Sequence, residues 1–384
     1  MTDLPRSASV VIVGAGVVGA AIAFHLTQQG VHDVLVLERD HAGAGSTGKN
    51  AGGIRLQFSS EINVRLSLLS VPEIERFADI TGVDPQFHQV GYLFLVTTDR
   101  DAVAFERSFQ LWKRLEVPAR RLNPDETHAL LPQLNVSDVR FASFCERDGY
   151  ADPSSLLRGY LTCARAAGAR VVEGARVDGI EVANGSVRRV RVGGKAVVCE
   201  YVVDAAGAWA GEVAAAAGVA IPITPHRRTI FVTEAFDGLP ERFPMVIDFA
   251  TGFYFHRESG GVLMGMPPAQ EVDGFREDVD WDVLPLVVER AMYRVPVLER
   301  ARIKTGWAGL YEDTPDAHPI VGFVGQPSGF VAACGFSGHG VMHAPAIGRL
   351  IAELITGAPP SIDLAALALD RFRRGATVRE HNVI

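Results

Sequence analysis

The sequence is poor in cysteine. Only four cysteines occur among 384 residues, Cys145, Cys163, Cys199 and Cys334, and no two are close enough to form a CxxC metal or redox pair. Scattered thiols of this kind are typical of reduced core residues, which favours a cytoplasmic protein. A ferredoxin-like cysteine cluster is absent from the sequence, so any iron–sulfur relay would have to lie on another chain.

Long apolar runs and excess positive charge are missing too. The longest apolar segment, 10–24, is interrupted by three glycines and falls short of the ~20 residues that a membrane helix needs. Residues 1–9 hold one arginine and no cleavage-site pattern follows them, so we expect no signal peptide. The 45 acidic residues outnumber the 37 basic ones, giving a net charge of −8, which argues against a nucleic-acid partner.

Glycine, in contrast, is abundant at 39 residues, and the length suits two modules or one large domain with an insertion. The run 8–13 predicts a buried strand, 17–29 a helix and 34–37 a second strand. We expect further helices at 72–80, 102–115, 124–131, 154–167 and 345–356, and strands at 92–96, 229–233, 253–256, 262–266 and 330–333. A hairpin is expected within 187–203, with its turn at Gly193–Gly194.

The segment 11–19 carries a dinucleotide-binding fingerprint. Gly14, Gly16 and Gly19 have GxGxxG spacing between the first strand and the first helix, which suits a tight turn under a pyrophosphate. Glu38 ends the second strand, where a carboxylate accepts hydrogen bonds from ribose hydroxyls. The fingerprint alone is compatible with either NAD or FAD.

Four further motifs occur in order along the chain: GSTGKNAGGIR (45–55), VVDAAGAW (202–209), TPDAHPIVG (314–322) and CGFSGHGVM (334–342). With the fingerprint they resemble the D-amino-acid-oxidase (DAO) superfamily of FAD enzymes, and within it sarcosine oxidase and the β subunit of dye-linked L-proline dehydrogenase. The resemblance extends from residue 10 to about residue 357. It implies FAD as the cofactor, because an NAD-dependent dehydrogenase would not explain the 334–342 loop.

We therefore predict an α/β fold with an α+β insert. A Rossmann-like FAD-binding domain would comprise the discontinuous ranges 1–80, 146–215 and 305–384. A second, sheet-based substrate domain, 81–145 and 216–304, would be inserted in it.

The resemblance also implies FAD contacts in the fingerprint, in three of the four further motifs and at a few positions outside them. Glu38 would bind the adenosine ribose, Arg39 would flank the adenine, and Val177 matches an adenine contact of the family. The 338–342 loop would lie beside the flavin, where a helix N-terminus would stabilise negative charge. The full expected set is Gly14, Gly16, Val18, Gly19, Glu38, Arg39, Ser46, Thr47, Asn50, Ala51, Gly52, Val177, Ala205, Ala206, Gly207, Gly309, Gly338, His339, Gly340, Val341 and Met342.

Three departures from sarcosine oxidase bear on the chemistry. Gly309 stands where that enzyme carries a flavin-linked cysteine, so non-covalent FAD is expected. Leu263 stands where a lysine assists the reaction with oxygen, which favours a dehydrogenase over an oxidase. Met342 stands where a lysine helps to hold the substrate carboxylate, so any carboxylate anchor must lie elsewhere.

The resemblance implies oxidation of a secondary amine or an α-amino acid of the proline, hydroxyproline, sarcosine or opine type. A hydride would pass from the α-carbon to flavin N5, and the imine would hydrolyse in water. The electron acceptor, whether a partner subunit, a quinone or oxygen, is left open, and the chain would suit either a stand-alone enzyme or the β subunit of a hetero-oligomer. Two alternatives remain: a 2-hydroxy-acid dehydrogenase, with His339 or His256 as base, and a non-catalytic flavin-bound assembly factor.

Candidate catalytic residues are Arg55, Tyr254, His256 and His339. Arg55 could form a fork with a carboxylate or pair with a structural acid. Tyr254 and His256 alternate with phenylalanines on a predicted strand, so the two kinds of side chain should point to opposite faces. Met264 and Met266 could line an apolar pocket or pack in the core.

Three other polar features are given less weight. Arg227–Arg228 is interpreted as a solvated strand start, with an acidic substrate tail or a partner subunit as the alternatives. His318 is expected to form hydrogen bonds within a loop. His339 and His343 have HxxxH spacing but lack the glutamate of a zincin motif, so no metal site is expected.

Overall fold

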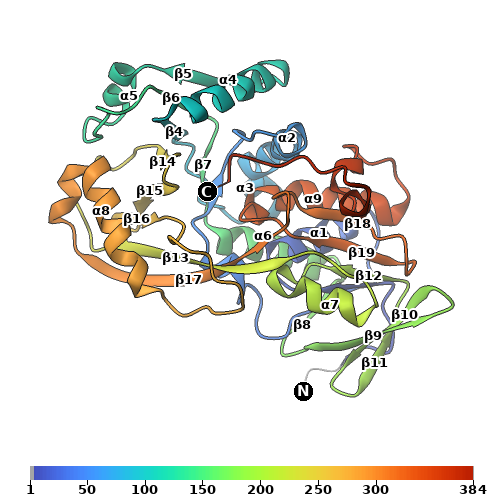
Figure 1. Cartoon of the computed structure of the whole chain (residues 1–384). Helices are drawn as coiled ribbons and strands as arrows, with labels where there is room; N and C mark the ends of the chain where they lie inside the picture. The colour runs from blue at the N-terminus through green and yellow to red at the C-terminus, as the bar shows by residue number, and fades with distance from the viewer. Residues whose placement is uncertain (1–3, 384) are drawn as a thin grey trace.

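Two β-sheets organise the chain in the computed structural model, which describes residues 4–383 (Figure 1). The first sheet has the order β18-β19-β12-β1-β2-β8. Its strands are β18 (Ile320–Phe323), β19 (Phe330–Cys334), β12 (Tyr201–Asp204), β1 (Val10–Val13), β2 (Val34–Leu37) and β8 (Arg170–Val172). All pairs are parallel except β18–β19, as expected of a Rossmann-like sheet with an antiparallel edge strand.

Helices cover one face of this sheet and a small sheet covers the other. Val10 and Ile12 pack in the same cluster as helices α1 (Val17–Gln28), α6 (Pro153–Ala166) and α9 (Gly340–Thr356). Val11 and Val13 pack instead with the three-stranded sheet β9 (Val177–Ala183), β10 (Ser186–Val192), β11 (Lys195–Val198) and with helix α7 (Ala210–Ala216). Burial on both faces explains why β1 and β2 are continuous apolar runs.

The second sheet has eight strands in the order β17-β13-β16-β15-β14-β4-β6-β5. Its strands are β17 (Ile303–Asp313), β13 (Thr224–Thr233), β16 (Gly261–Gly265), β15 (Phe253–Glu258), β14 (Met245–Asp248), β4 (Tyr92–Val96), β6 (Phe141–Cys145) and β5 (Ala119–Leu122). Helix α8 (Leu284–Arg294) packs on one face, and helix α4 (Asp99–Arg114) packs on the other. Figure 1 shows β13 and β17 as long strands that run from α8 toward α7.

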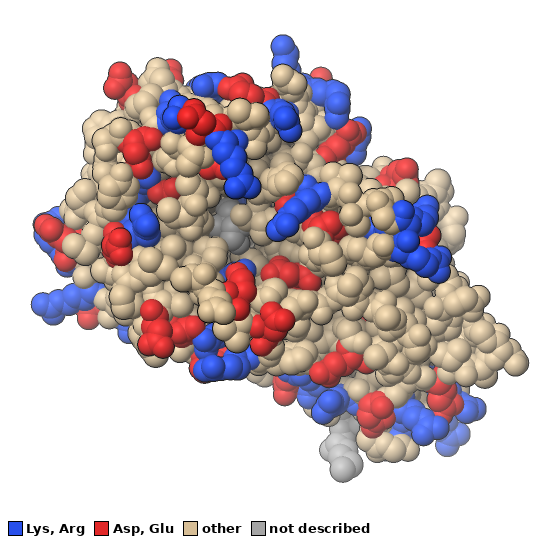
Figure 2. Space-filling model, viewed as in Figure 1, with Lys and Arg blue, Asp and Glu red and all other residues tan. Residues whose placement is uncertain are grey.

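The remaining elements lie between these strands and helices or follow them in the chain. They are η1 (Ser46–Lys49), β3 (Gly53–Ile54), α2 (Glu61–Glu75), α3 (Phe77–Thr81), α5 (Pro124–Leu130), β7 (Gly149–Tyr150), η2 (Gly207–Trp209), η3 (Trp281–Val283), η4 (Pro296–Arg300), η5 (Ala365–Leu367) and α10 (Asp370–Arg374). No helix of residues 4–383 has both the length and the apolar character to cross a membrane. Lys, Arg, Asp and Glu are interspersed over the face that Figure 2 shows.

Two predicted strands have the observed bounds, and the other predicted elements differ from the observed ones by one to several residues. Strands β2 and β4 coincide with 34–37 and 92–96. The helix predicted at 72–80 is helical except at Arg76, but it is not one element: its first part is the end of α2, which begins at Glu61 and contains Pro72, and its second part is α3. Helix α9 begins at Gly340, five residues before the predicted start, and has Pro345 inside it.

The predicted hairpin within 187–203 is only partly correct. Strands β10 and β11 pair around a turn at Gly193 and Gly194, whose φ angles of 54° and 80° favour glycine. Residues 201–203 belong instead to β12, which pairs with β1 in the parallel sheet. Alternation alone could not separate the two, because β11 and β12 are only two residues apart.

The two sheets follow the expected division of the chain closely. Every strand of the six-stranded sheet lies within 1–80, 146–215 or 305–384. The strands of the eight-stranded sheet lie within 81–145 and 216–304, except that β17 starts at Ile303 and continues to Asp313. Strand β17 thus crosses the expected boundary, and the division into two domains stays a prediction.

Candidate cofactor and substrate site

A cavity of about 540 Å³ is lined by residues of both sheets. Val13 and Leu37 reach it from the six-stranded sheet, and Ile230, Met245 and Tyr254 reach it from the eight-stranded sheet. A volume of this order is typical of cofactor and small-molecule sites.

The β1–α1 turn forms one end of this cavity and leaves no room for side chains. Gly14 has φ +107°, and a Cβ added there would lie 2.4 Å from the Ala205 carbonyl oxygen. A Cβ at Gly19 would lie 2.1 Å from the Gly14 carbonyl oxygen, and one at Gly16 would lie 3.1 Å from Thr47 Oγ1. The three glycines thus allow strand, helix and loop to approach closely.

Glu38 ends β2 beside this turn. Its Oε2 accepts a hydrogen bond from the Ala15 N–H at 2.9 Å, and its Oε1 accepts one from the Asp40 N–H at 3.0 Å. The neighbouring Arg39 lies over the Trp209 ring, with its guanidinium carbon 3.6 Å from the ring centroid. Glu38, Arg39 and Trp209 all line the cavity.

The loop around η1 connects the turn to the eight-stranded sheet. Thr47 Oγ1 accepts a hydrogen bond from the Val17 N–H at 3.0 Å, and Ser46 Oγ donates to the Leu310 carbonyl oxygen at 2.6 Å. Asn50 Nδ2 donates to the carbonyl oxygens of Ser46 and Thr47, which fixes the loop backbone. This loop therefore holds the cofactor end and the β17 side of the cavity together.

Two helix N-termini meet at the cavity. Helix α1 begins at Val17 and α9 begins at Gly340, and neither has a side-chain hydrogen bond at its N-cap. Residues 338–342, which include the first turn of α9, line the cavity together with Gly16 and Val17. Thr47 accepts from the Val17 N–H, and the other N–H groups of these first turns, together with the positive ends of two helix dipoles, suit a ligand that carries two electron-rich groups.

His339 is fixed as a neutral hydrogen-bond donor. Its Nε2 lies 3.2 Å from Arg55 Nη2, and because a guanidinium can only donate, Nε2 must accept. Nδ1 therefore carries the proton, and no acceptor in residues 4–383 takes it up. Burial, together with the charge of Arg55, lowers the pKa of His339 well below its usual value.

The Arg55 guanidinium forms hydrogen bonds to backbone carbonyls. Its Nη1 donates to the Gln57 carbonyl oxygen at 2.7 Å, and its Nη2 donates to the Asn382 carbonyl oxygen at 2.5 Å. The Phe58 ring lies 3.9 Å from the guanidinium carbon. Arg55 lines the cavity and is 1% exposed. It pairs with backbone carbonyls rather than with a structural acid, and a role toward a substrate carboxylate stays a prediction.

Most residues predicted to bind the cofactor line this one cavity. They are Gly14, Gly16, Val18, Glu38, Arg39, Ser46, Thr47, Asn50, Ala51, Gly52, Val177, Ala205, Ala206, Gly207, Gly309, Gly338, His339, Gly340, Val341 and Met342. Gly19 is not among the lining residues and serves instead the contact between helix and turn.

The opposite wall carries three tyrosines, Tyr92, Tyr254 and Tyr311, together with Arg228. No hydroxyl of these tyrosines forms a hydrogen bond within residues 4–383. Burial raises the pKa of all three, so each hydroxyl stays protonated and can donate to a ligand. The sequence predicted Tyr254 here and gave an acidic substrate tail as an alternative contact of Arg227–Arg228, whereas Tyr92 and Tyr311 were missed.

The predicted alternation along β15 is confirmed, but His256 does not line the cavity. Tyr254 packs with the cavity-side core, and Phe253 and Phe255 pack with the opposite core. His256 is 1% exposed, its ring lies 4.3 Å from that of Tyr150, and its Nδ1 lies 2.8 Å from the Arg257 carbonyl oxygen. His256 is packed against the tilted Tyr150 ring and is not among the cavity-lining residues, so the structure does not bring this candidate to the site.

The structure also shows where other residues considered in the sequence lie. Met264 and Met266 pack in the core on the far face of the eight-stranded sheet. His318 is a buried loop residue, with Nδ1 2.9 Å from the Asp316 carbonyl oxygen and Nε2 2.8 Å from Ser60 Oγ. No group of three or more His, Cys, Asp and Glu in residues 4–383 is arranged to hold a metal ion.

Glu312 is a buried acid at the cofactor side of the cavity. Its Oε2 has no hydrogen-bond partner within residues 4–383 and lies near Gly207, where an added Cβ would be 3.8 Å away. Burial raises the pKa of Glu312 to about 7. The unpartnered Oε2 is therefore a polar atom that a bound ligand could contact.

Comparison with known proteins agrees with this geometry. A family model described as FAD dependent oxidoreductase (DAO) matches residues 9–354. FAD-dependent oxidoreductase domain-containing protein 1 of Xenopus laevis is 32% identical, over 99% of this chain and 85% of its own length. Mitochondrial sarcosine dehydrogenase of Mus musculus is 31% identical over 97% of this chain, which spans only 42% of that larger protein.

Solved structures give the same result. L-Proline dehydrogenase from P. horikoshii has a TM-score of 0.92 and 32% identity, covering 98% of this chain and 100% of its own. Glycine oxidase from Geobacillus kaustophilus has a TM-score of 0.86 and 27% identity, covering 96% of this chain and 99% of its own.

Proposed function

This chain belongs to the DAO family of FAD-dependent oxidoreductases, and from that premise we propose that it is a dehydrogenase of a secondary amine or an α-amino acid that holds its FAD non-covalently. The observation that carries the proposal is one cavity that joins a dinucleotide-type turn to a wall of protonated tyrosines. The names of two relatives, proline dehydrogenase and sarcosine dehydrogenase, refer to secondary amino acids and support this class of substrate.

The residues around the cavity fit FAD. The Gly14–Gly16 turn and the first turn of α1 would hold the pyrophosphate, and Glu38 would bind the adenosine ribose. Residues 338–342 would lie beside the flavin, and Glu312 offers one carboxyl oxygen, Oε2, that has no partner within residues 4–383. The lining residues of the described chain include no cysteine, and their one histidine is His339, which supports non-covalent binding.

Bound FAD would supply the two-electron oxidant, which accepts a hydride from the carbon next to the substrate nitrogen. The chain itself would bind and orient the neutral amine, and oxidation of such an amine needs no strong base. His339 Nδ1–H and the start of α9 would donate hydrogen bonds where negative charge develops. His339 is unsuited to act as a base through Nε2, because that atom already accepts from Arg55.

The cavity offers little help for a reaction with oxygen. Lys49 is the one lysine among the described lining residues, and its Nζ lies 2.7 Å from Glu277 Oε1, which neutralises it. Leu263, at the position expected for an oxygen-activating lysine, is buried in the core at 1% exposure. We therefore propose that a partner subunit or a quinone accepts the electrons.

An anaerobic visible spectrum tests the proposal. Purified, FAD-loaded protein is titrated with primary and secondary amino acids and then with 2-hydroxy acids, and the oxidised-flavin band is followed. Bleaching by an amino acid is the expected result. Admission of air should then restore the band slowly, and addition of a quinone or a dye should restore it quickly.

Other outcomes would contradict parts of the proposal. Bleaching by 2-hydroxy acids alone would make the chain a hydroxy-acid dehydrogenase. A flavin band that no compound bleaches would favour a non-catalytic assembly role. Rapid reoxidation by air would identify an oxidase.

A further inference from the structure

A strap of residues 267–280 connects β16 to η3 and is tied down by ion pairs on several sides. Glu277 pairs with Lys49 at 2.7 Å, and Asp273 pairs with His226 at 3.0 Å. Phe275 stacks on Trp209 with 5.5 Å between ring centroids. Because Lys49, Trp209 and Glu277 also line the cavity, the strap borders the cofactor and substrate site.

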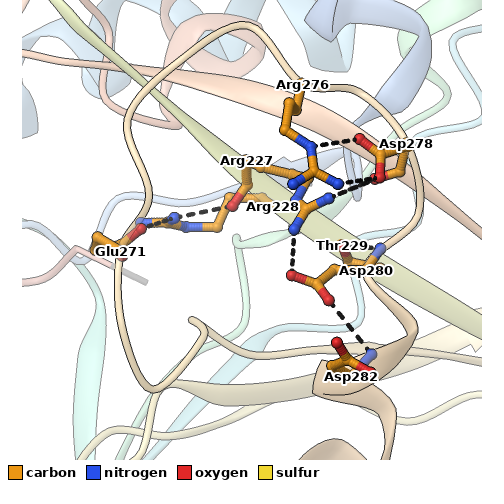
Figure 3. Close-up of polar contacts among 8 residues, drawn as sticks. All are labelled: Arg227, Arg228, Thr229, Glu271, Arg276, Asp278, Asp280 and Asp282. Atoms are coloured by element: carbon orange, nitrogen blue, oxygen red, sulfur yellow. Dashed lines mark hydrogen bonds and ion pairs between the residues drawn. The ribbon is translucent and has the colours of Figure 1, made fainter.

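Two adjacent arginines of β13 meet this strap in different ways (Figure 3). Arg227 pairs with Asp278 at 3.0 Å and also with Asp280, and it does not line the main cavity. Arg228 pairs with Glu271 at 2.7 Å and does line the cavity. The expected solvated strand start is therefore wrong, since the two side chains are only 14% and 15% exposed.

Strand alternation explains the difference. Side chains at positions two apart share a face of a strand, so Arg228 lies on the same face as Ile230 and Val232. Ile230 and Val232 pack in the cavity-side core, whereas Phe231 packs in the opposite core. Arg227 consequently lies on the face that turns away from the cavity.

One edge of the Arg228 guanidinium is unused. Nη1 donates to Glu271 Oε2 at 2.7 Å and to the Arg227 carbonyl oxygen at 3.2 Å. Buried Nε has no partner within residues 4–383, and no hydrogen bond from Nη2 to these residues is formed. Nε and Nη2 lie on the same edge of a guanidinium, which is the edge that receives a carboxylate through two parallel hydrogen bonds.

We propose that the Nε/Nη2 edge of Arg228 binds the carboxylate of the substrate and that Glu271 positions this edge by holding Nη1. The inference rests on the proposed function and narrows its substrates to amines that carry a carboxylate. It also supplies the anchor that the sequence could not identify.

The surroundings of Arg228 suit this role. The Tyr311 ring lies 4.8 Å from its guanidinium carbon, which limits the rotation of the side chain. Tyr311 and Tyr254 place protonated hydroxyls in the same cavity. A carboxylate bound there would be largely shielded from water, where charge-assisted hydrogen bonds are strong.

Glu271 has a second consequence for binding. Its negative charge offsets the positive charge of Arg228, so it weakens attraction for a second carboxylate while it orients the guanidinium. The two ends of one ion pair should therefore act in opposite directions on carboxylate binding. A pair that served only to hold the strap would respond in the same direction when either end is changed.

Binding of pyrrole-2-carboxylate and of its neutral amide, pyrrole-2-carboxamide, tests the inference without turnover. Both are planar, carry no oxidisable carbon next to nitrogen, and can be followed by their perturbation of the visible flavin band in the FAD-loaded protein. The native protein should prefer the carboxylate by about 30-fold or more. In Arg228→Met this preference should disappear. Arg228→Lys should retain only part of it, because an ammonium group cannot offer two parallel donors to a carboxylate as the guanidinium edge does.

Two variants complete the design. Arg227→Met is the matched control, because it removes a neighbouring guanidinium from the other face of β13, and it should keep the full preference. Glu271→Gln keeps a hydrogen bond to Nη1 without the negative charge and should bind the carboxylate about threefold more tightly. Flavin content and thermal unfolding of each variant show whether the site is still assembled.

Three results would overturn the inference. They are a native protein that binds the amide as tightly as the carboxylate, an Arg228→Met variant that keeps the preference, and weaker carboxylate binding in both Arg228→Met and Glu271→Gln. Failure of the proposed function is a separate observation, because it would leave the flavin unbleached by every amine whatever the two pyrrole probes show.

Discussion

Glu380 accepts two hydrogen bonds from Ser60, from the hydroxyl at 2.7 Å and from the backbone N–H at 3.0 Å. Ser59 donates two more, from its N–H at 2.7 Å and its hydroxyl at 2.5 Å. Ser60 is the N-cap of α2, so this carboxylate stabilises the positive end of a helix more than 300 residues earlier in the chain. The same segment brings the Asn382 carbonyl oxygen to Arg55.

Glu380→Ala should lower the free energy of unfolding by about 3 kcal/mol, because several hydrogen bonds to one buried charge are lost and buried donors are left unpaired. Urea unfolding followed by circular dichroism measures this change. Glu299→Ala, which removes a carboxylate of η4 that forms no ion pair with residues 4–383, is the control and should lie within about 0.5 kcal/mol of the native protein. Equal effects of the two changes would contradict the capping role.

Glu380 should also make the stability of the protein depend on pH. Burial alone would raise the pKa of Glu380, but hydrogen bonds from Ser59 and Ser60 outweigh it and lower this pKa below its usual value. A group of this kind contributes stability that is present above the unfolded pKa of about 4.3 and is lost as the pH falls through the folded pKa. Glu380→Gln should therefore show a flatter loss of stability below pH 5 than the native protein, measured by thermal unfolding across pH 3–7. Parallel curves would assign the acid sensitivity to other carboxylates.

Glu38→Ala should weaken FAD binding by about 10-fold to 100-fold. The variant lacks the carboxylate that would form charge-assisted hydrogen bonds to the ribose and that accepts from the Ala15 and Asp40 N–H groups. Titration of the apoprotein with FAD, followed by flavin fluorescence, gives the affinity. Asp33→Asn changes a carboxylate at the other end of the same strand, where it pairs with Arg170, and should leave the affinity unchanged. Unaltered FAD affinity in Glu38→Ala would remove Glu38 from the ribose role.

Gly14→Ala should abolish FAD retention even if the protein folds. The added methyl group would lie 2.4 Å from the Ala205 carbonyl oxygen, and the φ of +107° is unfavourable for any other residue. Gly30→Ala is the matched control, since it also has a positive φ, of +85°, but meets nothing within 4 Å. Flavin content after purification is the measurement, and comparable FAD retention in both variants would show that the close approach to Ala205 is dispensable.

Acid precipitation should release the flavin into the supernatant, because the described cavity-lining residues include no cysteine and Gly309 offers no nucleophile. The absorbance of pellet and supernatant at the flavin band decides the point. Yellow colour that remains with the protein would identify a covalent bond, and peptide mapping would then examine His339 first.

Much of the cofactor side could be predicted from the sequence because short motifs fix it locally. The glycines of the β1–α1 turn and Glu38 follow from strand, turn and helix succession within 30 residues. The opposite wall of the cavity could not be predicted in this way. Its residues Arg228, Tyr311 and Tyr92 come from three strands whose neighbours are set by the sheet order. In sequence, Arg227 and Arg228 are equivalent, and only the register of β13 with β16 and β17 distinguishes them.

Two histidines show the same limit. Tyr254 and His256 share a face of β15, but the cavity reaches only Tyr254, since Tyr150 covers His256. His339 was predicted from its loop and lines the cavity, whereas its protonation state depends on Arg55, which lies 284 residues earlier. Contacts over such separations leave no local signal.

The residues around the cofactor site are far apart in sequence, so they are synthesised at different times. Strand β1 and its glycine turn leave the ribosome early, but the carbonyl of Ala205 that faces Gly14 and the 338–342 loop are translated about 190 and 320 residues later. A nascent chain can therefore present only half of the cofactor cradle, with a glycine-rich turn that has nothing to close against. We therefore expect tight FAD binding only after translation has passed α9. Complete chains made during riboflavin shortage would lack the stabilisation that a bound ligand gives to the folded state.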